Sequence, residues 1–129
     1  MSTPVIQPLD DEALMSLFKH RALGFSSRRD INLSMMVSFG TRSGIVRIHQ
    51  GSVSEVNESS TPLQSWDFAI KGSNEGWNRF WEETPQPGWH DIFALTKRGE
   101  FDISGQLQPL MAHLQCIKDL LAVGRRGTA

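Results

Sequence analysis

The sequence predicts an α+β domain with a mainly antiparallel five-stranded sheet and helices packed on one face. Three observations lead to this prediction. Apolar residues alternate with polar ones over much of residues 31–71, which indicates strands, and they recur at helical spacing before and after that stretch. The chain of 129 residues also suits a single domain, expected to span residues 1–129.

The first element is predicted to be a helix over residues 10–23. Asp10 suits the N-cap position, and Asp11 would lie in the first turn, where the positive end of the helix dipole favours a carboxylate. Leu9 and Leu14 stand at the two positions of a hydrophobic staple. Because the apolar face is narrow, this helix must gain its stability by docking on another surface.

The sheet is predicted over residues 31–71. In the segment 31–39, five apolar residues alternate with four others of which one is apolar, a pattern typical of a half-buried strand. Further strands are expected at residues 45–50, 53–56 and 65–71, with a hairpin turn at Gly51-Ser52. Short links between them favour a meander of four antiparallel strands.

Helical spacing returns after Gly72, and a helical cover is predicted over residues 73–97. Ser73 can cap a helix whose apolar residues are Trp77, Phe80 and Trp81. A Pro-Gly-rich break separates it from a second short helix with Ile92, Phe93 and Leu95. A last strand is expected at residues 100–104. A C-terminal helix is expected at 108–123, with Pro109 at its first position.

All four tryptophans lie between residues 66 and 89, and the chain has no tyrosine. Trp66 would share the inner face of the fourth strand with Phe68 and Ile70. Trp77 and Trp81 would share a helix face, and Trp89 follows the break. We therefore expect one sheet edge and one helix to form an aromatic wall, either as part of a filled core or as the side of a pocket.

Composition limits the classes of partner. Lys and Arg number 13 against 14 Asp and Glu, and the charges are evenly mixed, which argues against nucleic acid binding through phosphates. There is no polybasic patch of the kind that holds a protein on anionic lipid, and no apolar run of the roughly 18 residues that a membrane span needs. No signal-peptide pattern is visible, so a cytoplasmic location is expected. Cys116, the single cysteine, cannot form an internal disulfide and is expected to be a small buried hydrophobe.

No catalytic or phosphate-binding motif occurs, and the four histidines are too scattered for a recognisable metal site, so neither metal nor cofactor is expected. His90-Asp91 is the best acid and base pair, although Asp91 suits a helix N-cap better. One alternative is therefore a small enzyme of the nuclear-transport-factor type, an isomerase, dehydratase or epoxide hydrolase, using His90 with Asp91 or Asp67. A second alternative is a structural or dimerising subunit.

Two segments resemble the sterol-carrier-protein (sterol transfer) family. Residues 68–77, FAIKGSNEGW, are similar to its strand-to-helix step, and residues 92–105, IFALTKRGEFDISG, to its helix, glycine, strand, glycine segment. The resemblance extends over roughly residues 31–123. The C-terminus lacks a peroxisomal Ser-Lys-Leu tripeptide, which favours a bacterial-type carrier or accessory domain over a peroxisomal one.

This resemblance implies a non-catalytic fold with an apolar tunnel for a fatty acyl chain, sterol or similar lipid. The implied partner is an apolar small molecule or lipid, and a homodimer or a partner enzyme is also possible in this family. The residues expected to line the tunnel are Met35, Val37, Phe68, Trp77, Trp81, Phe93, Met111 and Leu114.

Overall fold

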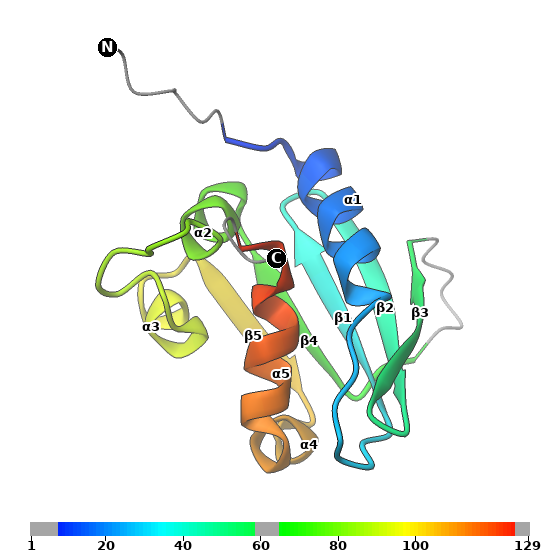
Figure 1. Ribbon diagram of the computed structural model, residues 1–129. Coiled ribbons are helices and arrows are strands. Elements are labelled where there is room, and N and C mark those ends of the chain that lie inside the picture. The colour runs from blue at the N-terminus through cyan, green and yellow to red at the C-terminus, as the bar shows by residue number, and fades with distance from the viewer. Residues whose placement is uncertain (1–7, 59–64, 126–129) are drawn as a thin grey trace.

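The computed structural model describes residues 8–58 and 65–125 (Figure 1). The order of elements is the predicted one up to the C-terminal helical part. The elements are α1 (Asp11–Ala22), β1 (Leu33–Phe39), β2 (Arg42–His49), β3 (Ser52–Asn57), β4 (Phe68–Gly72), α2 (Asn74–Phe80), α3 (Ile92–Lys97), β5 (Phe101–Gly105), α4 (Leu107–Ala112), α5 (Leu114–Leu121) and a final 3-10 turn, η1 (Ala122–Gly124).

The five-stranded sheet of an α+β fold is confirmed, but the sheet is mixed, with the order β3-β2-β1-β4-β5. β4 lies parallel to β1, with Met35 beside Phe68, so the predicted meander is wrong at its fourth strand. β4 therefore lies on the opposite side of β1 from β2. The burial of Phe68, Ala69 and Ile70 in succession is typical of such a central strand.

β1 confirms the clearest strand prediction. Leu33, Met35, Val37 and Phe39 are buried and define the inner face of the sheet, while the residues between them are half-buried. α1 and α5 lie on this face (Figure 1), and their buried side chains join those of the sheet in one core. The core therefore lies between the inner face and these two helices.

The helix starts also agree with the sequence. Asp10, Ser73 and Asp91 are the N-caps of α1, α2 and α3, and the side chain of each accepts a hydrogen bond from a backbone N–H in the first turn. Asp91 thus has the capping role that the sequence favoured for it.

The β2–β3 hairpin forms one residue earlier than predicted. Gln50 and Gly51 are the turn residues, with φ angles of 51° and 81°, and His49 pairs with Ser52. Two positive φ angles match the twist of the flanking strands, as in a type I′ turn. A side chain at Gly51 would also collide with the carbonyl oxygen of Arg29, so both the turn and the packing require glycine there.

The predicted position of Trp66 on the inner face is wrong. Trp66 precedes β4, and 42% of it is exposed. Phe68 and Ile70, which were predicted to share that face with Trp66, are fully buried. The prediction is therefore confirmed for these two residues. The strand begins later than its apolar pattern suggests because Asp67 is the residue that meets β1, its carboxylate accepting a hydrogen bond of 2.9 Å from the backbone N–H of Ser34.

The predicted helix over residues 108–123 is two helices. His113, with φ −124° and ψ 32°, leaves the helical region and separates α4 from α5. The bend lets α4 lie at the end of β4 and β5 while α5 runs across the inner face (Figure 1). Periodicity alone could not show this bend, because the apolar spacing continues through it.

Candidate functional site

The candidate site is the interface between the inner face of the sheet and the helices that cover it. α5 contributes Ile117, Leu120 and Leu121 to the core, and all three are fully buried. α1 contributes Leu14, Met15, Phe18 and Ala22 beside them. The side chains that α1 and α5 bury at this interface are apolar, so the interface suits apolar surface and not charge.

One end of the interface is closed by a cluster of aromatic rings. The ring of Trp77 lies 4.6 Å from that of Phe39 and 4.6 Å from that of Phe101, and 5.3 Å from the ring of Trp81. Phe80 packs edge-on against Trp77 at 5.9 Å. The predicted aromatic wall thus exists, but strands β1 and β5 supply its sheet side, and Trp66 takes no part in it.

Hydrogen bonds hold the C-terminal end of α5 against this cluster. The indole Nε1 of Trp81 donates to the carbonyl oxygen of Leu121 at 2.7 Å. Arg21, on α1, donates to the carbonyl oxygens of Val123 and Arg125, each at 3.0 Å. Burial of these groups makes the bonds costly to break without replacement.

Arg125 extends the same network to α2. Its guanidinium donates two hydrogen bonds, of 3.1 and 3.0 Å, to the carbonyl oxygen of Phe80 and stacks over the Phe80 ring at 5.0 Å. Burial lowers the pKa of Arg125. The rings around Trp77 and Trp81 together with these bonds are referred to below as the anchored end.

The opposite end of α5 is held differently. There Cys116 lies beside Ser27 of the loop after α1, and burial raises the pKa of the Cys116 thiol. Nδ1 of His113, at the bend, is the one buried side-chain polar atom of the described residues that has no hydrogen-bond partner in the structure. This region, with α4 and Trp66, is referred to below as the α4 end.

An open cleft of about 560 Å³ lies at the α4 end. Its lining combines apolar side chains with polar groups, namely Gln106, Leu107, Gln108, Pro109, Ala112 and His113. The bend at His113 was missed by the sequence reasoning, and no local signal marks it apart from a polar residue between two apolar positions.

The eight residues expected to line a tunnel occupy three kinds of position. Met35, Val37, Phe68, Trp77 and Trp81 are buried in the core, Phe93 and Leu114 are half-buried against it, and Met111 is 56% exposed at the α4 end. The structure brings the first five together at one interface. None of the eight lines the cleft at the α4 end or either of two further clefts, which lie over α2 and beside His90.

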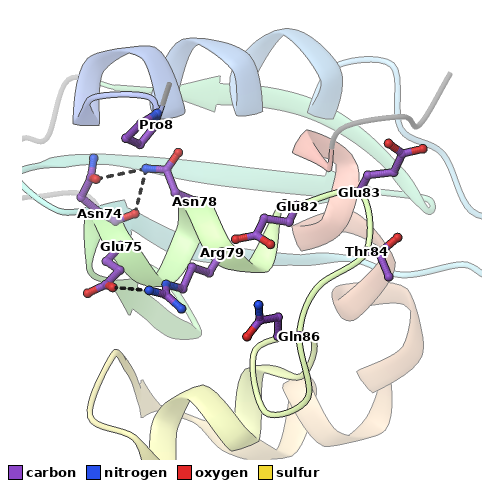
Figure 2. A pocket seen from close by; sticks show the side chains of 9 residues that line it. All are labelled: Pro8, Asn74, Glu75, Asn78, Arg79, Glu82, Glu83, Thr84 and Gln86. Atoms are coloured by element: carbon purple, nitrogen blue, oxygen red, sulfur yellow. Dashed lines mark hydrogen bonds and ion pairs between the residues drawn. The ribbon is translucent and has the colours of Figure 1, made fainter. Parts of the chain in front are cut away.

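The largest of those clefts, about 720 Å³, is polar and lies outside the core, over α2 and the loop after it (Figure 2). Glu75 and Arg79 form an ion pair of 3.1 Å across successive turns of α2. The amide of Asn78 donates to the carbonyl oxygen of Leu9 at 2.9 Å and accepts from the Leu9 N–H at 2.8 Å. These bonds fasten the chain before α1 to α2, which is a structural task.

The residues of the enzyme alternative do not form one acid and base site. Asp91 caps α3 and forms an ion pair of 3.2 Å with Lys118 on α5. His90 is exposed and lines, with Asp91, a cleft of about 180 Å³ that does not include Asp67. Among the described residues, no three His, Cys, Asp or Glu side chains gather where they could hold a metal ion.

Comparison with solved structures connects this architecture to known proteins. The model overlays on palmitated SCP2L2 from Aedes aegypti with a TM-score of 0.54 and 14% identity, over 88% of this chain and 95% of that one. It overlays on the apo form of sterol carrier protein 2 from Yarrowia lipolytica with a TM-score of 0.51 and 10% identity, over 84% and 97%. The chain has the sterol carrier protein fold.

The ubiquinone synthesis protein UbiJ-SCP2 shares this fold, with a TM-score of 0.50 and 14% identity over 89% of this chain and 91% of that one. Neither a protein-family model nor a curated protein sequence matches the chain. The likeness therefore lies in the arrangement of the sheet and its covering helices. Within the part of the chain that the structure describes, no helix has the length and apolarity to cross a bilayer.

Proposed function

We propose that the chain binds an apolar, lipid-like ligand between the inner face of the sheet and the α4–α5 segment, without transforming it. The observation that carries the proposal is a sterol carrier protein fold whose covering helix α5 meets the sheet through apolar side chains only. Binding would be driven by the removal of apolar surface from water, at roughly 25 cal/mol per Å².

In this proposal the sheet residues Met35, Val37 and Phe68 form the floor of the site, with Phe93 beside it. Trp77 and Trp81 form its closed end. Leu114 and Met111 stand at the α4 end, where the ligand would enter. The buried Nδ1 of His113 lies at that end and supplies a polar atom for the head of an amphiphile.

The core residues are packed against one another, so a ligand must displace side chains of α5. The two ends of α5 differ in what holds them. The Leu121 end is held by the bonds from Trp81 and Arg21, whereas Cys116, near the other end, lies beside Ser27 of the loop after α1. We therefore expect α5 to move away from the sheet at the α4 end while its anchored end stays in place.

A disulfide between Ser27→Cys and the native Cys116 tests this proposal, because the two residues lie close to each other. A fluorescent fatty acid is titrated into the wild type, the oxidised variant and the reduced variant, and free-thiol counting verifies the bond. We expect the wild type and the reduced variant to bind, and the oxidised variant to bind at least about tenfold more slowly, with recovery on adding dithiothreitol.

Cys116→Ser in the Ser27→Cys background is the matched control, because it carries one thiol and cannot form the bond. Equal uptake by the oxidised and reduced variants would show that α5 does not move at this end. Absence of fatty acid binding by the wild type, together with absence of co-purified lipid in native mass spectrometry, would overturn the proposed function itself.

A further inference from the structure

Three of the four large hydrophobic side chains that are exposed in the described part of the chain lie at the α4 end. They are Trp66, Leu107 and Met111, exposed by 42%, 49% and 56%. Leu23, at the end of α1, is the fourth, with 48% exposed. Scattered exposed apolar residues are ordinary, but a group of them at one end of a small domain indicates an interaction surface.

The strand pairing places Trp66 and Leu107 at the same end of the sheet. Phe68 pairs with Gly105, and the N–H of Gln106 donates to the carbonyl oxygen of Asp67 at 2.7 Å. Trp66 and Leu107 are the next residues on each side, just beyond the paired strands, so both lie at the same end of β4 and β5. Because Trp66 and Leu107 are far apart in the sequence, the sequence alone does not show that they lie at one end of the sheet.

Met111 belongs to the same surface. It stands four residues after Leu107 on α4, which places both side chains on one face of the helix. Leu110, which lies between them on the helix, is buried in the core, whereas Leu107 and Met111 are about half exposed. No residue of α4 carries a charge, and this face therefore has no acidic group of its own helix to repel an anion.

Two basic residues lie at the same end of the molecule as this surface. Arg28 and Arg29 are exposed in the loop after α1, and Asp30 beside them is the one acidic residue of that loop. Ser27 of this loop lies beside Cys116, and the charge of Arg29 reaches the same thiol, so the loop lies next to the start of α5. Figure 1 shows the loop and α4 at the same end of the molecule.

We propose that Trp66, Leu107 and Met111 form a membrane-docking surface, which inserts into the headgroup region of a bilayer with Arg28 and Arg29 against the lipid phosphates. Indole rings and aliphatic side chains on an uncharged helix face, beside basic residues, fit the bilayer interface. Three side chains fall far short of the roughly 800 Å² that each partner buries in a standard protein–protein interface. Two arginines cannot anchor the protein by charge alone, so the apolar residues supply most of the attraction.

This inference goes beyond the proposed function, and it places the mouth of the proposed site against the membrane. Its test needs no ligand in the interior, so it can fail or succeed independently of the fatty acid titration. The protein is sedimented with vesicles of phosphatidylcholine and with vesicles of phosphatidylcholine mixed with phosphatidylglycerol. We expect binding to both, and tighter, salt-sensitive binding to the anionic vesicles.

Leu107→Gln with Met111→Gln should weaken vesicle binding about tenfold, because each change removes an apolar side chain from the inserted face. Leu23→Gln is the matched control, since Leu23 is equally exposed but lies away from α4, and it should bind as the wild type does. Arg28→Gln with Arg29→Gln should remove the preference for anionic vesicles and keep the binding to neutral ones.

The fluorescence of Trp66 provides a readout specific to its position. Brominated acyl chains should quench part of the tryptophan emission of the wild type and not that of Trp66→Phe, because the other indoles are buried or half-buried. Failure of the wild type to sediment, or unchanged binding by Leu107→Gln with Met111→Gln, would overturn the inference. So would light scattering that shows a dimer in the wild type and a monomer in that variant, because the surface would then join two copies of the chain.

Discussion

The two ends of the α5 helix differ in burial and in hydrogen bonding. At the anchored end, the rings of Phe39, Trp77 and Trp81 are buried, and the carbonyl oxygens of residues 121–125 accept hydrogen bonds from α1 and α2. At the α4 end the helix bends, a buried His113 nitrogen has no partner in the structure, and Met111 is exposed. The difference teaches that the buried rings and interhelical hydrogen bonds lie at one end of α5, whereas exposed apolar side chains lie at the other.

The comparison predicts that substitutions at the anchored end cost much more stability than equal substitutions at the α4 end. Trp81→Ala should lower the free energy of unfolding by about 3–5 kcal/mol, because it removes a large buried ring and the donor for Leu121. Trp81→Phe keeps most of the ring but leaves the Leu121 carbonyl unpaired, and should cost about 1–3 kcal/mol. Urea denaturation followed by circular dichroism measures both. A cost for Trp81→Ala below that of Trp81→Phe would contradict the ranking.

Gly124→Ala should be the next largest effect. A Cβ at this position would lie 2.6 Å from ring atoms of Trp81, so the ring or the chain must shift, at a cost of about 1–3 kcal/mol. Gly24→Ala is the control, because its Cβ would meet its nearest neighbour at 3.6 Å and its φ is not positive. Equal melting temperatures for the two variants would show that Gly124 is not tightly packed on Trp81.

Asp11 gives the anchored end a pH dependence. Hydrogen bonds from the Thr41 N–H, the Asn74 amide and the Thr41 hydroxyl lower its pKa below the ordinary 3.8. Because the pKa of the folded state is the lower one, the carboxylate stabilises the fold fully above the unfolded pKa, and this contribution is lost as the pH falls through the folded pKa. The difference in urea midpoint between the wild type and Asp11→Asn should therefore be constant above about pH 5 and shrink toward pH 3. A difference that grows as the pH falls would contradict this sign.

The smallest effect is expected at the α4 end. Leu107→Gln should change the free energy of unfolding by no more than about 0.5 kcal/mol, since the side chain is about half exposed and supports no core contact that the fold depends on. The same urea experiment measures it. A loss approaching that of Gly124→Ala would show that the α4 end is a structural part of the fold, and would weaken its interpretation as an interaction surface.

Several features of the fold follow from sequence signals that act over a few residues. The alternation in β1, the caps at Asp10, Ser73 and Asp91, and the order of elements up to β5 were predicted correctly. Each depends on a side chain and the backbone of its own neighbourhood, so the sequence is sufficient to show it. Of the candidate site, the burial of Met35, Val37, Phe68, Trp77 and Trp81 at one interface could be anticipated in the same way.

The remaining features depend on contacts between distant segments, and only the tertiary structure decided them. The parallel pairing of β4 with β1 is set by where the chain returns after β3, and the exposure of Trp66 follows from the meeting of Asp67 with Ser34. The bend at His113 is set by the need of α4 to lie at the end of the sheet while α5 crosses its inner face. Local periodicity is the same with or without that bend, so the sequence determined the helices and strands, and packing between them determined which apolar side chains are buried and which face outward.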